Sequence, residues 1–234
     1  MLYIIEWVIK IGGSLFPKSA IELLNVLKNC NCIVITGGGE FANLIRKYDN
    51  DIGFSNNITH ETAIDSMDII AKLLNDRLDF TKLVHSIEDA ENSLKAGHIP
   101  ILACSKLFSE NKDFYDLPHS WNLTSDSMSA YLAESLKAKL LIATNVDGIY
   151  TRKPTSVGSK FIQEIDAKKL LTFDETSVDL MLGEFLLKFG TNCFVVNGNF
   201  PERVLSLIED NSNSQLGNNN YKNYNFRYTL IRGE

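Results

Sequence analysis

The chain has 234 residues, of which 44% are hydrophobic and 22% are charged, with a formal net charge of −6. This composition is typical of a folded domain and excludes a largely disordered chain, while the acidic balance excludes the basic footprint of a nucleic-acid-binding protein. We expect a single domain over residues 1–234. Glu6 and Lys10 interrupt the apolar start, so neither a membrane span nor a signal peptide is expected. The four cysteines lack zinc-ligand spacing, which predicts reduced thiols and a cytoplasmic protein.

Strand-like apolar runs alternate with stretches of helical periodicity. In chain order, we expect a strand at 2–11, a helix at 21–27, a strand at 32–35, helices at 40–48 and 59–78, a strand at 83–85 and a helix at 88–96. The series continues with a strand at 99–103, a helix at 124–137, a strand at 140–144, helices at 166–171 and 178–189, a strand at 193–196, a helix at 201–208 and a strand at 226–231. The Asn-rich stretch 210–225 is expected to be a mobile loop. This alternation predicts an α/β fold, a three-layer α/β/α sandwich with a mainly parallel central sheet.

Glycine-rich loops follow the first two predicted strands, at residues 10–14 (KIGGS) and 36–39 (TGGG). Ligands of open α/β sheets bind at the carboxyl ends of strands, and glycine lets the backbone approach a phosphate closely. Neither loop is a Walker P-loop or a dinucleotide fingerprint. One such loop alone is more often a simple turn. Two on neighbouring strands favour phosphoryl transfer, with one loop for the donor, one for the acceptor, and Lys10 stabilising the charge of the transferring group.

Two further segments support a nucleotide site. Residues 144–151 (TNVDGIYT) place a turn at Asp147 and an aromatic side chain at Tyr150 directly after a strand, which suits a wall for a base and ribose. Taken alone, this segment is equally typical of a hairpin. Asp126 lies in the first turn of the helix predicted at 124–137, where an acid can also simply stabilise the helix dipole.

These segments and residues 124–127 (TSDS) occur in the order seen in the amino acid kinase family, which includes acetylglutamate, aspartate, uridylate and isopentenyl phosphate kinases. The chain resembles this family over nearly its whole length. The resemblance implies an ATP-dependent phosphotransferase with Lys10 and Asp126 as catalytic residues. It also implies Mg²⁺ bound with the nucleotide, without indicating its protein ligands, and a homo-oligomer with no membrane or nucleic-acid partner.

The resemblance also assigns the binding residues. Those expected at the transferring phosphate are Gly12, Gly13 and Ser14, and those expected at the acceptor are Gly37, Gly38 and Gly39. Those expected at the nucleotide are Thr144, Asn145, Asp147, Gly148, Tyr150 and Lys153. Several family members carry a second lysine before the last core helix, but residues 176–180 contain none. Lys160, or as second choice Lys153, is expected to supply that charge.

The acceptor is indicated by residues 117–122 (LPHSWN), which with the following TSDS resemble the branch that acts in methanofuran biosynthesis. Kinases of that branch convert an aminomethyl-furan methanol phosphate to its diphosphate. We therefore expect Trp121 to pack on a furan, His119 to contact phosphate, and Asp65 or Asp68 to bind an ammonium group. Trp121 is equally interpretable as a buried loop anchor.

Two alternatives remain open. One is a uridylate or isopentenyl phosphate kinase, the latter needing an apolar tunnel where an ammonium acceptor needs an acidic pocket. The other is a non-catalytic nucleotide- or oxyanion-binding protein on the same fold.

Overall fold

The computed structural model describes residues 5–110, 121, 123–173, 176–212, 222 and 224–234. The strands of the main sheet are β1 (Trp7–Ile11), β2 (Cys32–Thr36), β3 (Thr81–Val84), β4 (Ile99–Leu102), β5 (Lys139–Thr144), β8 (Glu164–Asp166), β9 (Cys193–Asn197) and β10 (Tyr228–Arg232). Their spatial order is β3-β4-β2-β1-β5-β9-β10-β8. A separate hairpin joins β6 (Ile149–Tyr150) and β7 (Phe161–Ile162).

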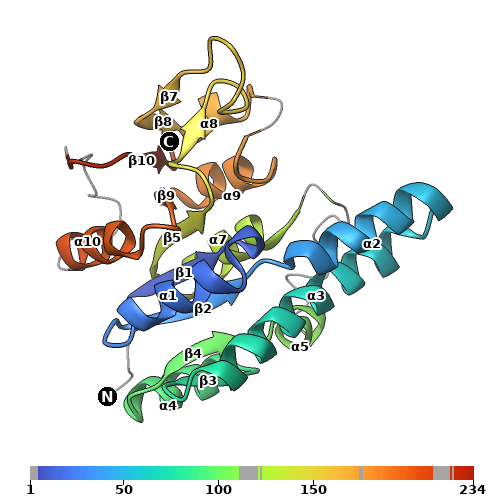
Figure 1. Ribbon diagram of the computed structural model, residues 1–234, viewed down its shortest axis with the longest axis vertical. Helices are drawn as coiled ribbons and strands as arrows, with labels where there is room; N and C mark the ends of the chain where they lie inside the picture. The colour runs from blue at the N-terminus through green and yellow to red at the C-terminus, as the bar shows by residue number, and fades with distance from the viewer. Residues whose placement is uncertain (1–4, 111–120, 122, 174–175, 213–221, 223) are drawn as a thin grey trace.

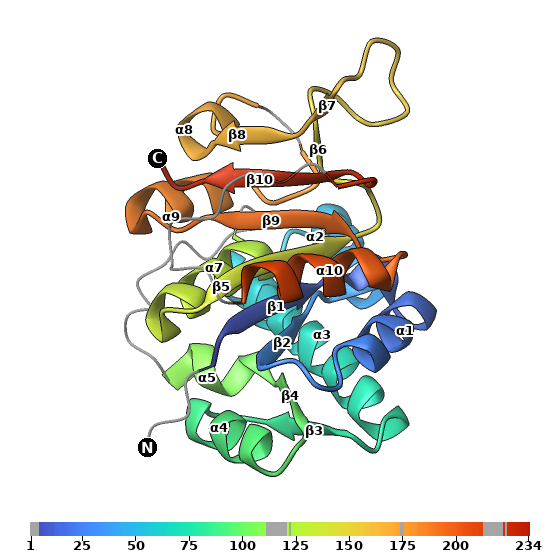
Figure 2. The same cartoon turned by 90° about the vertical axis from the view of Figure 1, so that its left-hand side faces the viewer.

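Helices cover both faces of the sheet (Figures 1 and 2). They are α1 (Lys18–Val26), α2 (Gly39–Ile52), α3 (Asn56–Arg77), α4 (Ile87–Lys95), α5 (Cys104–Glu110), α7 (Ser125–Leu136), α8 (Ala167–Leu170), α9 (Leu182–Phe189) and α10 (Pro201–Asn211), with a 3-10 turn η1 (Gly13–Leu15) after β1. β1 pairs in parallel with β2 on one side and β5 on the other. Within the main sheet, the antiparallel pair among the described strands is β9 with β10. The predicted α/β sandwich with a mainly parallel sheet is confirmed.

The pleat of β1 decides where its lysine points. All five residues of β1 are buried, and Trp7, Ile9 and Ile11 belong to one core cluster, which includes residues of α1 and α10. Val8 belongs to the other, which includes residues of α7 and α9. Because successive side chains of a strand alternate between faces, Lys10 shares the face of Val8. The central strand therefore delivers one cation to the side of the sheet covered by α7.

Several elements differ from the sequence-based expectation. The helix predicted at 178–189 begins at Leu182, because the Asp179 carboxylate accepts the Leu182 N–H before the helix starts. The helix predicted at 166–171 is shorter, since Asp166 ends β8 and caps α8. α5 was not predicted. Part of the expected loop 210–225 belongs to α10, and residues 213–221 and 223 lie outside the described residues.

Candidate active site

The loops that follow β1 and β2 touch each other. The Gly37 N–H donates to the Ile11 carbonyl at 2.8 Å, which extends the parallel pairing beyond the strand ends. A Cβ atom on Gly13 would lie 2.1 Å from the backbone nitrogen of Gly39, so only glycine allows this approach. Gly39 itself has a φ of +53°, a conformation that favours glycine. The two predicted glycine loops therefore converge, with Ser14 exposed beside them.

A buried ion pair lies beneath the loops. The Lys10 Nζ is 2.5 Å from Asp126 Oδ1, and the two side chains are only 9% and 6% exposed. Taking both charges out of water is energetically costly, so a lone buried pair is weak evidence for stability. Its position at the carboxyl end of the central strand and the amino end of α7 instead fits a functional group.

Asp179 holds the start of α7 and contacts Asp126. Its Oδ2 accepts the backbone N–H groups of Thr124 and Ser127, each at 3.0 Å, and the Thr124 hydroxyl at 2.8 Å. Its own N–H donates to Asp126 Oδ2 at 3.1 Å. Burial, together with the nearby Asp126 charge, raises the pKa of Asp179 to about 6. From the sequence, the segment 176–180 was noted only for lacking a lysine, and its acid was missed.

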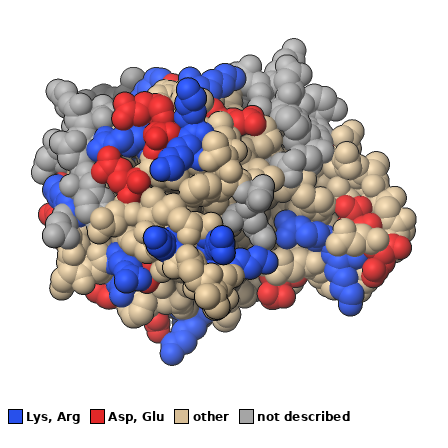
Figure 3. All heavy atoms as spheres, turned by 90° about the horizontal axis from the view of Figure 1, so that it is seen from above, with Lys and Arg blue, Asp and Glu red and all other residues tan. Residues whose placement is uncertain are grey.

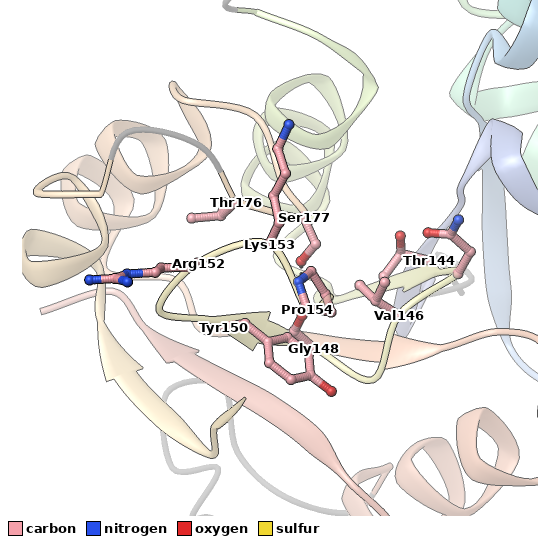
Figure 4. Close-up of a pocket in the computed structure, with 10 residues that line it drawn as sticks. Thr144, Val146, Gly148, Tyr150, Arg152, Lys153, Pro154, Thr176 and Ser177 are labelled. Carbon is pink, nitrogen blue, oxygen red and sulfur yellow. Dashed lines mark hydrogen bonds between the residues drawn. The ribbon is translucent and has the colours of Figure 1, made fainter. Parts of the chain in front are cut away.

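A pocket opens beside the third motif (Figure 4). It is lined by Thr144, Asn145, Val146, Gly148, Tyr150, Arg152, Lys153, Pro154, Thr176 and Ser177. Five of the six residues expected at the nucleotide are in this lining. Arg152 extends away from the other labelled side chains, whereas the Ser177 hydroxyl donates to the Gly148 carbonyl at 3.0 Å. The structure thus gathers most of the predicted nucleotide residues around one concavity.

Asp147 is the expected nucleotide residue that does not line the pocket. Its Oδ1 accepts from Arg203 at 2.9 Å and from Asn197 at 3.2 Å, so the carboxylate holds the turn in place. Lys160 is not brought into the lining either, because its side chain is exposed and its backbone pairs with Thr151 across the hairpin. Of the two candidate lysines, Lys153 is the one at the pocket.

The β6–β7 hairpin is anchored by β10. The Ile149 N–H donates to the Thr229 hydroxyl at 2.8 Å, and that hydroxyl donates to the Ile162 carbonyl at 2.5 Å. A Cβ on Gly148 would lie 2.4 Å from the same hydroxyl oxygen. Thr229 is completely buried. The turn of the third motif therefore depends on a close contact with a strand far away in sequence.

A second pocket lies on the other side of the glycine loops, between α2, α3 and the start of α7. We call it the acceptor groove; it is lined by Gly38, Ala42, Arg46, His60, Ala63, Ile64, Met67, Trp121, Leu123, Thr124, Ser125 and Met128. Gly38 and Ser125 connect this groove to the loops and to the helix that carries Asp126. Of the residues expected at the acceptor, Gly38 and Trp121 line it.

At one end of the groove, three side chains form what we call the outer cluster. The Trp121 Nε1 donates to Asp49 Oδ2 at 2.9 Å, and the Arg46 guanidinium carbon lies 4.5 Å from the centre of the Trp121 ring. Asp49 Oδ1 also accepts the Phe54 N–H at 3.0 Å, which fixes the carboxylate at the end of α2. Arg46 and Asp49 were not identified from the sequence. The helix was predicted only to residue 48, which left Asp49 outside it, and nothing in the local sequence indicated that either residue would meet Trp121.

The acids expected to bind an ammonium group lie elsewhere. Asp65 is on α3, but its side chain is largely exposed and does not line the groove. Partial burial of its carboxyl group, followed by the charges of Asp68 and Glu61, raises its pKa. Asp68 is buried and accepts the Cys104 N–H at 2.6 Å and the Ser105 hydroxyl at 2.5 Å, so it holds the start of α5. His119 lies outside the described residues.

The profile of the Amino acid kinase family matches residues 6–197, which include the glycine loops, the Lys10–Asp126 pair and the hairpin turn. The chain belongs to the amino acid kinase family. It is a phosphotransferase, a kinase. Within the described residues, no helix is long and apolar enough to cross a membrane.

Curated relatives of this kinase include two groups. The "[5-(aminomethyl)furan-3-yl]methyl phosphate kinase" of Methanocaldococcus jannaschii is 37% identical over 213 residues, covering 88% of this chain and 94% of that protein. A uridylate kinase of the same organism is 26% identical, covering 86% of this chain and 93% of that protein. The kinase is thus similar to both groups, with higher identity to the first.

Solved structures of low sequence identity share the fold. Uridylate kinase from Archaeoglobus fulgidus superposes with a TM-score of 0.68 at 20% identity, covering 97% of this chain and 99% of the other. UMP kinase from Ureaplasma parvum gives a TM-score of 0.71 at 17% identity, covering 98% and 99%. These similarities establish the architecture of the kinase independently of its motifs.

Proposed function

We propose that this kinase transfers the γ-phosphoryl group of ATP to the phosphate of a small acceptor, [5-(aminomethyl)furan-3-yl]methyl phosphate, giving the diphosphate. The observation that carries the proposal is the buried Lys10–Asp126 pair beneath two touching glycine loops, with one pocket on either side. One pocket reaches Thr144 at the end of β5 and the other reaches Gly38 and Ser125. Two such pockets suit a reaction in which two anionic reactants must lie in line. The 37% identity to the furan phosphate kinase supports the choice of acceptor.

In the proposed reaction, an oxygen of the acceptor phosphate attacks the γ-phosphorus. The bond from that phosphorus to the β,γ-bridging oxygen breaks, and ADP leaves with the electron pair. Lys10 neutralises charge on the transferring group, and the N–H groups around Gly13 and Gly39 orient its oxygens. Asp126 holds the ammonium group of Lys10 in place, and the backbone N–H of Asp179 donates a hydrogen bond to the Asp126 carboxylate.

Mg²⁺ is the divalent cation expected with the nucleotide, because phosphates bind it together with few protein ligands. The described residues contain no group of three or more His, Cys, Asp and Glu side chains placed to hold a metal ion. This donor set fits a cation that arrives with the nucleotide phosphates rather than one resident in a protein cage. Asp126 is the carboxylate beside the reacting phosphates.

A primary ammonium group on the acceptor needs a carboxylate near the end of the groove. Asp49, hydrogen-bonded to Trp121, takes the place that was expected for Asp65 or Asp68. The Trp121 ring provides the flat apolar surface for a furan. The second candidate is uridylate kinase activity, favoured by relatives at 26% and 28% identity.

The test is an ADP-release assay across acceptors, with the aminomethyl-furan phosphate, UMP, isopentenyl phosphate and small carboxylates compared at equal concentration. We expect the highest kcat/KM with the furan phosphate and greatly reduced turnover in Lys10→Ala. Preference for UMP would replace the proposed acceptor. ATP binding by calorimetry without any phosphoryl transfer would instead establish a non-catalytic nucleotide-binding protein.

We further propose that the kinase is a homo-oligomer assembled through α2. None of the 14 residues of this helix is buried, and α2 extends away from the sheet (Figure 1). Large apolar side chains at spacings of three or four residues form one exposed stripe, comprising Phe41, Leu44, Tyr48 and Ile52. A second copy covering this stripe accounts for its composition. Sedimentation equilibrium tests it, since Leu44→Glu should lower the mass of the particle.

No nucleic-acid partner is proposed. The net charge is −6. On the face drawn in Figure 3, Asp and Glu lie mainly at the upper left and at the right-hand end, and several Lys and Arg side chains lie between them. The excess of acidic over basic residues in the whole chain is not typical of a nucleic-acid-binding protein.

A further inference from the structure

The acceptor groove has an inner and an outer end. At the inner end, a Cβ on Gly38 would lie 2.0 Å from the Ser66 hydroxyl, and the Thr36 hydroxyl donates to the Met67 carbonyl at 2.8 Å. α2 and α3 therefore approach each other closely beside the glycine loops. Arg46 lies eight residues beyond Gly38 on α2, which at 1.5 Å per residue is about 12 Å along the helix. The groove thus has room for a molecule of limited length.

The walls between the two ends are mainly apolar, with His60 and Thr124 as polar residues among them. Side chains of the lining that carry no charge and no hydrogen-bonding group are Ala42, Ala63, Ile64, Met67, Leu123 and Met128. The inner end offers the amide groups of the second glycine loop and the start of α7, where a phosphate is favoured by the helix dipole. An acceptor with a phosphate at one end and a small apolar body fits this distribution.

The outer cluster lies at the other end of the groove. Trp121 comes from the segment before α7, whereas Arg46 and Asp49 are one turn apart on α2, so their contacts join two separate elements across the groove. Each partner is held by another: the indole by a carboxylate, the carboxylate by the Phe54 amide, and the guanidinium by the ring face. Cation–π and charged hydrogen-bond contacts of this kind hold side chains in defined positions.

We propose that Arg46, Asp49 and Trp121 set the maximum length of the acceptor, restricting this kinase to short, ring-sized phosphate esters. The proposal rests on the phosphate acceptor proposed above and adds a size limit with named residues. A substituent that continues past the far end of the ring would meet the outer cluster instead of solvent. The three residues determine specificity and take no part in the chemical step.

The experiment compares two acceptors with the same reacting end and a charged nitrogen: [5-(aminomethyl)furan-3-yl]methyl phosphate and its N-decyl derivative. ADP release gives kcat/KM for each, and their ratio is the readout. For the wild type, we expect the short acceptor to be preferred by about 100-fold or more, since each misplaced methylene group in a pocket changes discrimination by about tenfold or more. In Trp121→Ala, the ratio should fall by at least about tenfold through faster turnover of the long acceptor.

Two further variants separate the contacts from general damage. Trp121→Phe keeps a ring but loses the hydrogen bond to Asp49, and its ratio should lie between those of the wild type and Trp121→Ala. Lys47→Ala removes a positive charge from the neighbouring residue, which does not line the groove, and should leave the ratio unchanged. Thermal unfolding of each variant identifies any that does not fold.

The outcomes distinguish the two proposals. If the wild type uses the short acceptor but turns over the long one equally well, or if Trp121→Ala and Trp121→Phe both keep the wild-type ratio, the size limit is wrong and the proposed function stands. If the wild type releases no ADP with the short acceptor, the proposed acceptor is wrong and the size limit falls with it.

Discussion

Replacing Gly13 with alanine places a methyl group where the two glycine loops meet. The new Cβ would lie 2.1 Å from the Gly39 nitrogen and 2.4 Å from its Cα, whereas ordinary contact begins at 3.4 Å. Both neighbouring atoms are backbone, so the loops must separate by about 1.3 Å, the difference between 3.4 and 2.1 Å. Misplacement of reacting groups by about 1 Å can reduce a rate about 10²-fold. We therefore expect Gly13→Ala to lower kcat by about 10²-fold or more.

Overpacking also destabilises a protein by about 1–3 kcal/mol, so the assay needs a control of similar stability. Gly97 precedes β4 and so lies at the amino ends of the strands, whereas the glycine loops lie at their carboxyl ends. Its φ is +78°, and an added Cβ would meet no described atom within 4 Å. Gly97→Ala should therefore cost about 1–2 kcal/mol through backbone strain alone and leave kcat unchanged. ADP release and thermal unfolding are measured for both variants. If Gly13→Ala and Gly97→Ala have equal kcat values and equal stability, contact between the loops is not required.

Three other predictions concern the charges beneath the loops. Lys10→Ala should lower kcat by about 10²-fold or more, the effect of losing one electrostatic donor, with an unchanged circular dichroism spectrum; near-normal turnover would contradict its role. Asp126→Asn should slow single-turnover transfer more than it weakens ATP binding in calorimetry, and the reverse result would assign Asp126 to nucleotide binding. Asp179 has a folded pKa of about 6, above its ordinary 3.8, so its stabilising effect is complete below pH 3.8 and is lost as the pH rises through 6. The unfolding free energy of Asp179→Asn relative to the wild type should therefore increase from about pH 4 to about pH 7, and a constant difference would show that Asp179 titrates normally.

The parts of the site that sequence could predict are those fixed by local pattern. A buried strand followed at once by KIGGS determines both the position of Lys10 and, through strand alternation, the face of the sheet that it reaches. Asp126 was identified from the TSDS motif through the resemblance to the family, and the structure brings it to Lys10. Parallel strands place their carboxyl ends at one edge, which is why the two glycine loops meet.

The residues that sequence missed or misplaced act through long-range contacts. Asp65 was chosen for its charge and its helix, but rotation about the helix axis puts Ile64, not Asp65, against the groove. Asp179 meets α7 across 52 residues of sequence and Trp121 meets Asp49 across 72. No local pattern records such pairings, because they follow from how α2, α7 and the segment before α9 pack together.

Because Thr229 supports the β6–β7 hairpin, the order of synthesis limits when this hairpin can form. The glycine loops and Lys10 leave the ribosome early, together with β2, whereas β5, the other partner of β1, follows only after α7. The hydroxyl that holds the Ile149 amide is synthesised 80 residues later than that amide. A nascent chain therefore contains Lys10 long before it contains the residue that holds the β6–β7 hairpin, and this hairpin can reach its final position only after β10 has been made.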